Sequence, residues 1–452
     1  MKDRLDGVRK LVWLYLWLLL FEGALRKWIF PGLSAPLLII RDPVVIAIYA
    51  MAFRHNVFPR SAFIAWIFIL GFISFAISFT GIGSIFITIY GMRANFLHLP
   101  LIFLMPKILR VEDVKEMGKL VLFVLPLMAL LAVLQFKGGT ESRWNYGAGG
   151  EVAGQLVVAE GKMRASGTFS FVSGMVVYLA LSAAFLLYNL LEKNIYSKKL
   201  VMAALPALII ALAVSGSRAA VISVGVVCVM VLYISIRLPE RFGSAIKPMV
   251  LTLIAVAAVS ALSPVFKEGI DVHRNRFKSG GGLKEGIAQR TVDGFSTGLD
   301  AVFFAPMLGH GLGVGTNAGA AMMTGKRDFT LSEGEWGRVI LESGPAMGLA
   351  YIALRIAMFL FILMQALKAY MFGETLSLLL VGASGLILIN GQFGQPTTLG
   401  FAVFVSGLAY AAAQPRSRTE TKIPVPVAPN QHAPIIMGRS PYAERLHDDS
   451  QS

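Results

Sequence analysis

The sequence predicts an all-α protein that crosses a membrane about twelve times. Hydrophobic residues make up 56% of the 452 residues, whereas charged residues make up only 15%, well below the content of an ordinary soluble domain. The mean hydropathy is +0.68. Long apolar runs recur along the chain, with short polar connections between them. This composition excludes a soluble multidomain enzyme and indicates a multi-pass membrane protein.

Each predicted span is an apolar run of roughly the length that crosses a bilayer, about 20 residues. Charged residues interrupt the first, second and fourth runs. The first run follows four basic residues, as in a signal peptide, but no small-residue cleavage site comes after it, so we expect an uncleaved helix. The predicted spans are 11–30, 33–52, 61–80, 82–106, 118–136, 167–191, 199–216, 217–236, 249–265, 345–367, 374–391 and 396–413.

The distribution of lysine and arginine predicts the orientation. In the short connections these residues gather on the side that holds the N-terminus, for example at Arg60 and Lys107. Because such residues stay in the cytoplasm, both termini are predicted to be cytoplasmic. The membrane domain would cover 1–413, with a large outer loop at 266–344 between the ninth and tenth spans. The segment 414–452 is rich in Pro, Ser and charge and is predicted to be a disordered cytoplasmic tail.

The charge balance and the absence of common motifs reduce the number of functions that the sequence allows. The chain carries 41 Lys and Arg against 26 Asp and Glu, a net charge of +15. Such an excess fits nucleic acid or an anionic membrane face. Because the basic residues are scattered among short connections, we predict a membrane protein with no nucleic-acid partner. The sequence has no HExxH, CxxC or Walker-type loop, so we predict neither a metal nor another cofactor.

Ionisable residues inside the predicted spans are candidates for a site, because an unpaired charge at membrane depth costs several kcal/mol. Glu22 and Arg26 are spaced i, i+4 and can pair on one helix face. Arg41 and Asp42 precede a proline, which suggests a kink with a local ion pair. Arg93 has no carboxylate nearby in the sequence, so we expect it to contact another helix or a ligand.

Two further arginines lie at the outer ends of predicted spans. Arg218 follows Gly216 and two serines in AVSGSRAAVISV, where the backbone can turn tightly. It is either an interfacial anchor or a phosphate ligand, since a guanidinium matches phosphate with a planar fork of donors. Arg164, in KMRASGTFSF, is either a simple flank or a second such ligand.

The outer loop at 266–344 holds the densest set of basic residues. Arg290 is followed by a segment with glycines at 309, 311, 313 and 315. Such a glycine run can form a backbone nest for an anion, although it is weak evidence alone. His310 lies within it and is a minor candidate for a catalytic role.

The segment LSEGEWGRVILESGP follows in the same loop. Glu335, Arg338 and Glu342 are spaced i, i+3, i+7 and share one face if the segment is helical. Glu333 lies just before them. One interpretation is an Arg338–Glu342 ion pair with capping carboxylates. The other is a carboxylate base beside an arginine that binds an anionic leaving group.

Together these motifs resemble the bacterial O-antigen ligase and polymerase superfamily of integral membrane glycosyltransferases. The segments that carry the resemblance are SGSRAAVISV, RTVDGFSTGLDAVFFAPMLGHGLGVG, EWGRVILESGPAMGLAYIAL and KMRASGTFSF. The opening FEGALRKWIFPGLS with IIRDP is similar to an exopolysaccharide-associated branch. The resemblance extends to about residue 413. It implies a GT-C-like fold in the bacterial inner membrane, with the outer loop in the periplasm.

The resemblance also implies a substrate and roles for particular residues. The donor would be an oligosaccharide on a polyprenyl diphosphate, transferred with inversion and without a metal. A flippase and a chain-length regulator would be partners in surface or exopolysaccharide synthesis. The expected base is Glu333 or Glu335. The expected diphosphate ligands are Arg218, Arg290 and Arg338, with Arg93 and Arg164 as second choices.

Several alternatives remain open. Ligases of this superfamily carry a His-Asn pair where this chain has Glu333 and Gly334, which favours a polymerase over a ligase. A transporter of lipid-linked sugars would also need intramembrane arginines, but not an outer loop rich in both Arg and Glu. A non-catalytic scaffold of an export machine is the third class.

Overall fold

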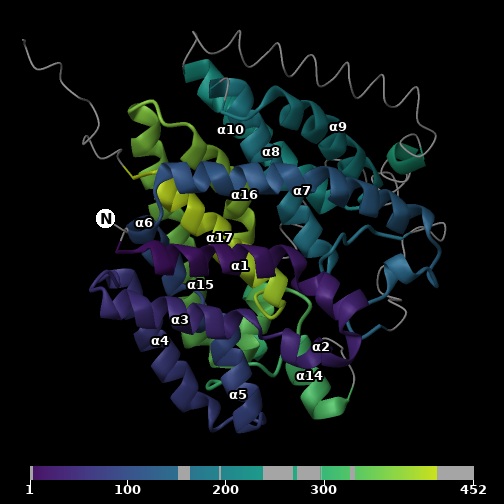
Figure 1. The fold of residues 1–452 in the computed structure, drawn as a ribbon. Coiled ribbons are helices and arrows are strands. Elements are labelled where there is room, and N and C mark those ends of the chain that lie inside the picture. Colours follow the sequence, from purple (N-terminus) through teal and green to yellow (C-terminus); the bar gives the residue numbers. More distant parts are fainter. Residues whose placement is uncertain are drawn as a thin grey trace, which may run out of the picture. The chain divides into compact units, whose positions relative to one another are not determined.

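The computed structural model describes residues 4–150, 163–192, 195–237, 268–271, 296, 298–325 and 331–414. The described part of the chain is all-helical, which confirms the predicted class (Figure 1). The predicted span 249–265, the part 272–295 of the outer loop and nearly all of the tail lie outside the described residues. Those predictions therefore stay predictions.

The N-terminal helices contain a π-helical segment with buried cations. Helix α1 (Asp6–Ala24) continues directly into the π-helix η1 (Leu25–Ile29), where Arg26 and Lys27 are buried. Short turns η2 (Pro31–Leu33) and α2 (Ser34–Leu37) lead to α3 (Arg41–Arg54), which packs against α1. π segments usually interrupt α-helices where local packing demands it, often at functional sites.

A second π-helical segment interrupts the next membrane-length unit. Helix α4 (Ala62–Ser78) and helix α5 (Ile85–Met92) both begin after a serine whose hydroxyl accepts a backbone N–H. Helix α5 continues as the π-helix η3 (Arg93–Leu97). Pro100 then starts α6 (Pro100–Ile108), which is bent by 43° from the α5–η3 axis.

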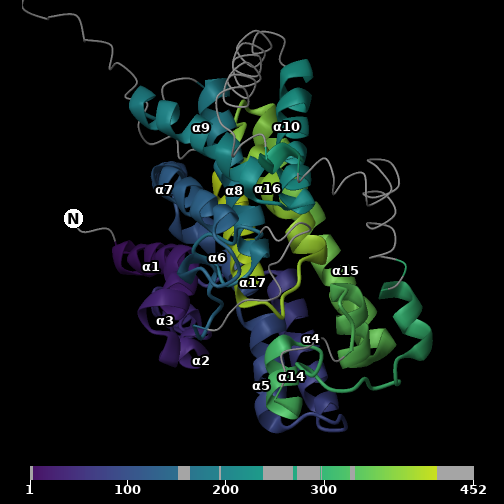
Figure 2. The same ribbon diagram turned by 90° about the vertical axis from the view of Figure 1, so that its right-hand side faces the viewer.

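The middle of the chain forms four longer helices, and the last three helices complete the bundle. Helix α7 packs against α9, whereas α8 packs against α10 and α16. Helix α17 is buried along nearly its whole length and contacts α6, α8 and α16; Figure 1 shows it in yellow beside α16 and α1. The short α14 lies beside α5, as both views show (Figure 2). The bounds are α7 Val111–Lys137, α8 Val172–Glu192, α9 Lys198–Val214, α10 Arg218–Arg237, α14 Asn317–Thr324, α15 Glu335–Met371, α16 Leu376–Asn390 and α17 Pro396–Ala412.

The helix lengths support a membrane protein. By length and apolar composition, five described segments could cross a bilayer, or six if the bent α5–η3–α6 unit is one span. Three shorter apolar helices are α4, α16 and α17. The count of twelve spans and the orientation of the termini stay predictions.

A buried ion-pair network in the N-terminal helices is hydrogen-bonded to the start of α17. Glu22 pairs with Arg26 at 3.4 Å, as the i, i+4 spacing predicts. Its other oxygen accepts from Arg41 Nε at 2.9 Å, and Arg41 Nη2 donates to the carbonyl of Pro396 at 2.6 Å. Arg41 is 1% exposed, so these bonds fix α1, α3 and α17 at one point.

The expected local pair between Arg41 and Asp42 is wrong. Adjacent residues on a helix point about 100° apart and do not face each other. Arg41 therefore contacts Glu22, whereas Asp42 accepts from Arg93 Nε at 2.6 Å. Arg93 thus finds its carboxylate on another helix, as its sequence context predicted.

A close approach at Gly400 makes the Arg41 contacts possible. A Cβ at this position would overlap the guanidinium of Arg41. We predict that Gly400→Ala lowers the midpoint of thermal unfolding of the purified protein, because overpacking costs about 1–3 kcal/mol. Gly225→Ala on α10 is the matched control, since a Cβ there meets nothing within 4 Å. Equal melting of the two variants would contradict the tight contact.

Candidate functional site

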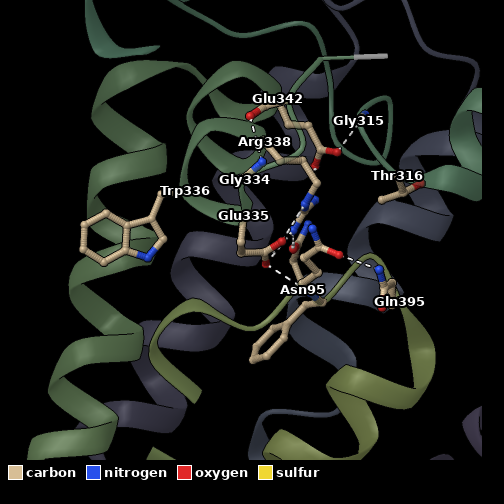
Figure 3. Close-up of polar contacts among 12 residues, drawn as sticks. Asn95, Gly315, Thr316, Gly334, Glu335, Trp336, Arg338, Glu342 and Gln395 are labelled. Carbon is tan, nitrogen blue, oxygen red and sulfur yellow. Dashed lines mark hydrogen bonds and ion pairs between the residues drawn. The ribbon is translucent and has the colours of Figure 1, made fainter. Parts of the chain in front are cut away.

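The site is built at the start of α15. Gly334 precedes the helix in an extended conformation (φ −81°, ψ 139°), and Glu335 is the first helical residue. Glu335, Arg338 and Glu342 lie on one face, as their spacing predicted (Figure 3). Their exposed fractions are 2%, 4% and 1%. Trp336 points away from this face in the same view and donates to the Ile389 carbonyl at 3.2 Å.

Arg338 is the centre of the cluster. Its Nε and Nη2 donate to the two oxygens of Glu335, both at 2.9 Å. Its Nη1 donates to Glu342 at 2.7 Å, and Nη2 also donates to the side-chain oxygen of Asn95 at 2.9 Å. The two-pronged contact with Glu335 is the strongest geometry that an arginine and a carboxylate can form.

A second buried arginine, Arg355, was missed by the sequence analysis. Its Nη1 donates to Glu335 at 2.7 Å, while its Nε and Nη2 donate to the carbonyls of Leu388 and Gly391, both at 2.8 Å. Its guanidinium lies 3.6 Å from the ring centre of Phe393. The rule that charges in apolar spans mark sites would have found it, because it lies within the predicted span 345–367.

A break in α15 brings Glu335 and Arg355 together. Twenty residues of straight α-helix would separate them by about 30 Å along the axis. Gly344 has φ +81° and ψ 164° and is followed by Pro345, so the helix changes direction there. A Cβ at Gly344 would overlap the carbonyl of Met307. Glycine is therefore required both for the backbone angle and for the close approach.

The glycine-rich loop before α14 closes the other side of the cluster. Gly309, Gly311 and Gly313 have φ values of +74°, +106° and +87°. The N–H of Gly311 donates to the Glu342 carbonyl, and that of Gly315 to the Glu342 carboxylate, both at 2.9 Å. The loop that was predicted to hold an anion thus contacts the protein's own carboxylate.

The π-helix η3 joins this cluster to the N-terminal network. Asn95 accepts from Arg338 through its side chain, and its carbonyl accepts from the hydroxyl of Tyr351 at 2.8 Å. Two residues earlier, Arg93 pairs with Asp42, whose other oxygen lies 2.9 Å from His98 Nε2. Arg93 Nη1 is buried and has no hydrogen-bond partner within the described ranges. The N–H donors of this nitrogen are therefore unused within the described ranges.

A small pocket opens beside Glu335 and Arg338. Its other borders include Glu333, Gln392 and Gln395. The cavity volume is about 10 Å³, about the space that one water molecule needs. Gln392 Nε2 donates to the Glu333 carbonyl at 2.6 Å, and the side chains of Gln392 and Gln395 are hydrogen-bonded. These contacts link the turn before α17 to the segment that precedes α15 at the border of the pocket.

The two candidate bases differ in their surroundings. Glu335 accepts four hydrogen bonds, from Arg338 twice, from Arg355, and from the N–H of Phe393 at 3.2 Å. Glu333 is exposed. In the part of the chain that the structure describes, its carboxylate makes no ion pair. Glu333 is thus the accessible carboxylate, and Glu335 is the buried, fully bonded one.

Arg164 and Arg218, two of the remaining predicted ligands, lie away from this pocket. Arg290 is outside the described residues. Arg218 begins α10 after a tight turn, in which Gly216 has φ +58°, as its sequence predicted. Arg164 precedes Ser166 and Gly167, which both accept from the buried ammonium of Lys27. Arg164 and Arg218 do not border the pocket beside Arg338.

Metal-ligating groups do not gather at this site. Across the described ranges, no three His, Cys, Asp or Glu side chains are placed to hold a metal ion. The charge available at the pocket is therefore that of arginine guanidiniums and carboxylates.

The contacts of the cluster predict that the stability of the fold depends strongly on its arginines. We expect Arg355→Met to destabilise the fold by about 3–5 kcal/mol, because it leaves Glu335 and Glu342 sharing one guanidinium inside the protein. The midpoint of thermal unfolding in detergent measures this. Glu333→Gln is the matched control, since its side chain is exposed and its melting should equal that of the wild type. An unchanged midpoint for Arg355→Met would show that the cluster does not hold the fold.

Comparison with known proteins does not assign the chain to a family. Searches against protein-family models and against curated proteins find no match to this chain. The likeness of its motifs to the O-antigen ligase and polymerase superfamily therefore stays an expectation.

Proposed function

We propose that the chain is a membrane glycosyltransferase that polymerises oligosaccharide repeat units carried on a polyprenyl diphosphate. The observation that carries the proposal is the pocket beside α15, where an exposed carboxylate, Glu333, borders the same space as the buried pair of Glu335 and Arg338. This pocket lies at one end of a helix that is long and apolar enough to cross a membrane. The motif resemblance supplies the substrate class.

The proposed chemistry is a single displacement at the anomeric carbon. A hydroxyl oxygen of the acceptor sugar forms the new bond to that carbon. The bond to the diphosphate oxygen breaks, and the diphosphate leaves with the electron pair. Glu333 takes the hydroxyl proton, because a base must lie within hydrogen-bond reach of that group. Such a displacement inverts the anomeric centre.

The leaving diphosphate needs positive charge, which arginines can provide without a metal ion. In the structure Arg338 is fully engaged by Glu335, Glu342 and Asn95. Its part is then to hold the wall of the pocket, and it binds diphosphate only if these contacts rearrange. Arg93 stays a second choice in the proposal: its buried Nη1 has no hydrogen-bond partner within the described ranges, but Arg93 does not border the pocket. Arg218, Arg290 and Arg164 complete the proposed set by the motif resemblance alone, since Arg218 and Arg164 do not border the pocket and Arg290 is outside the described residues.

The setting of the reaction follows from the same resemblance. We place the pocket at the periplasmic face of the bacterial inner membrane, with both chain termini in the cytoplasm. A flippase would deliver the lipid-linked donor to this face, and a chain-length regulator would act on the product. A ligase that transfers the glycan to a lipid or protein acceptor is the alternative, as is a transporter of the lipid-linked oligosaccharide.

Deletion of the gene should distinguish a polymerase from a ligase, and the Glu333 and Arg218 variants then separate a polymerase from a transporter. We predict that the deletion strain accumulates a single repeat unit on its carrier lipid, because chain growth stops. The mass distribution of extracted lipid-linked oligosaccharides, compared with the parent strain, measures this. Accumulation of long lipid-linked polymer would show a ligase instead. An unchanged profile would contradict both glycosyl-transfer proposals.

The two carboxylates should respond differently to the same substitution. Glu333→Gln should reduce polymer formation by about 10²–10⁴-fold, the usual contribution of a general base, and leave the melting temperature unchanged. Glu335→Gln should instead lower the melting temperature, because it unbalances Arg338 and Arg355. Both variants are expressed in the deletion strain and compared at equal protein level. Full polymer from Glu333→Gln would remove that residue as the base.

A further inference from the structure

A second and larger cavity lies between the connection 56–61, which follows α3, and the helices α4, α6, α15 and α17. Its volume is about 670 Å³, within the range of pockets that take a small ligand, about 300–1,000 Å³. The residues that matter for its chemistry are Arg60, Phe63, Phe103, Lys107, Phe361 and Tyr410. None of them has a part in the proposed transfer reaction.

The wall of this cavity is aromatic. Each of the four helices contributes one ring. Phe63 stacks on Phe103 with ring centres 5.1 Å apart, and it lies 5.2 Å from Phe361. Phe361 meets Tyr410 edge-on at 5.3 Å. Because the rings hold one another in place, the cavity offers a preformed apolar surface of the kind that a hydrocarbon chain fills.

The rim of the cavity is positively charged. Arg60 and Lys107 are both exposed, and within the described residues neither makes an ion pair. Among the residues that the structure describes, no acidic residue borders the cavity. Nearby Arg9, by contrast, is paired with Asp113 at 3.1 Å. Two unpaired cations above an aromatic wall match an amphiphile with a negative head and an apolar tail.

The cavity is separate from the pocket beside α15. Gln395 borders that pocket and precedes α17, whereas Tyr410 lies near the other end of the same helix. Fifteen residues of helix span about 22 Å, a large part of the roughly 30 Å hydrocarbon core. Arg60 and Lys107 also belong to the basic connections that predict the cytoplasmic side. The ligand of this cavity would therefore come from the cytoplasmic leaflet, opposite the leaflet beside the α15 pocket.

We propose that this cavity binds an anionic phospholipid. Arg60 and Lys107 hold the headgroup phosphate, and one acyl chain lies on the four rings. A zwitterionic lipid fits less well, because its own cation cancels the attraction to the two basic side chains. The proposal does not depend on the glycosyltransferase activity, and either can fail without the other.

Lipid binding can be measured on the purified full-length protein. Phosphatidylglycerol is titrated in detergent, with phosphatidylcholine as the zwitterionic comparison, and the shift in melting temperature gives an apparent Kd. We expect stabilisation by phosphatidylglycerol only. The double variant Arg60→Gln, Lys107→Gln should bind it about tenfold more weakly or worse, since two charge-assisted contacts are lost.

The matched control is Arg54→Gln, an exposed arginine at the end of α3 that does not border the cavity. It should retain wild-type binding. The melting temperature without lipid checks that the double variant is folded. Equal stabilisation by both lipids, or equal loss in the Arg54 control, would overturn the proposal. Stabilisation by polyprenyl phosphate but not by phosphatidylglycerol would also overturn it, because the cavity would then serve the substrate carrier.

Discussion

The sharing of two buried carboxylates between two buried arginines is the constraint on which the site depends. Glu335 and Glu342 contact Arg338, and Glu335 also contacts Arg355, with all four side chains at most 5% exposed. An unpaired charge in such surroundings costs several kcal/mol. The arrangement is therefore kept only if α15, η3 and the turn before α17 stay where they are.

Irregular segments of two helices bring the charged groups of this cluster together. The break at Gly344 returns the second half of α15 toward its own start, which places Arg355 within 2.7 Å of Glu335. The π-helix η3 places Asn95 against Arg338 and Arg93 against Asp42. Regular helices would separate these groups. The irregular backbone thus coincides with the buried ionic cluster, as is common at functional sites.

In this cluster the residues that stabilise the fold differ from the carboxylate that is accessible for chemistry. Arg338 has partners on all sides, and Glu335 is equally saturated. Glu333 lies two residues before Glu335 and is exposed. A reaction at this pocket would therefore use the exposed carboxylate, while the buried groups keep the wall rigid.

Local sequence pattern determined the helical class, the places of most apolar helices, the shared face of Glu335, Arg338 and Glu342, and the tight turn before Arg218. These features depend on periodicity and on backbone angles over a few residues, which the sequence carries directly. Only the tertiary structure decided which charges pair across helices: Arg41 with Glu22, Arg93 with Asp42, and Arg355 with Glu335. The physical reason is that such pairing depends on how helices bend and pack, and residues distant along the chain carry no local signal of it.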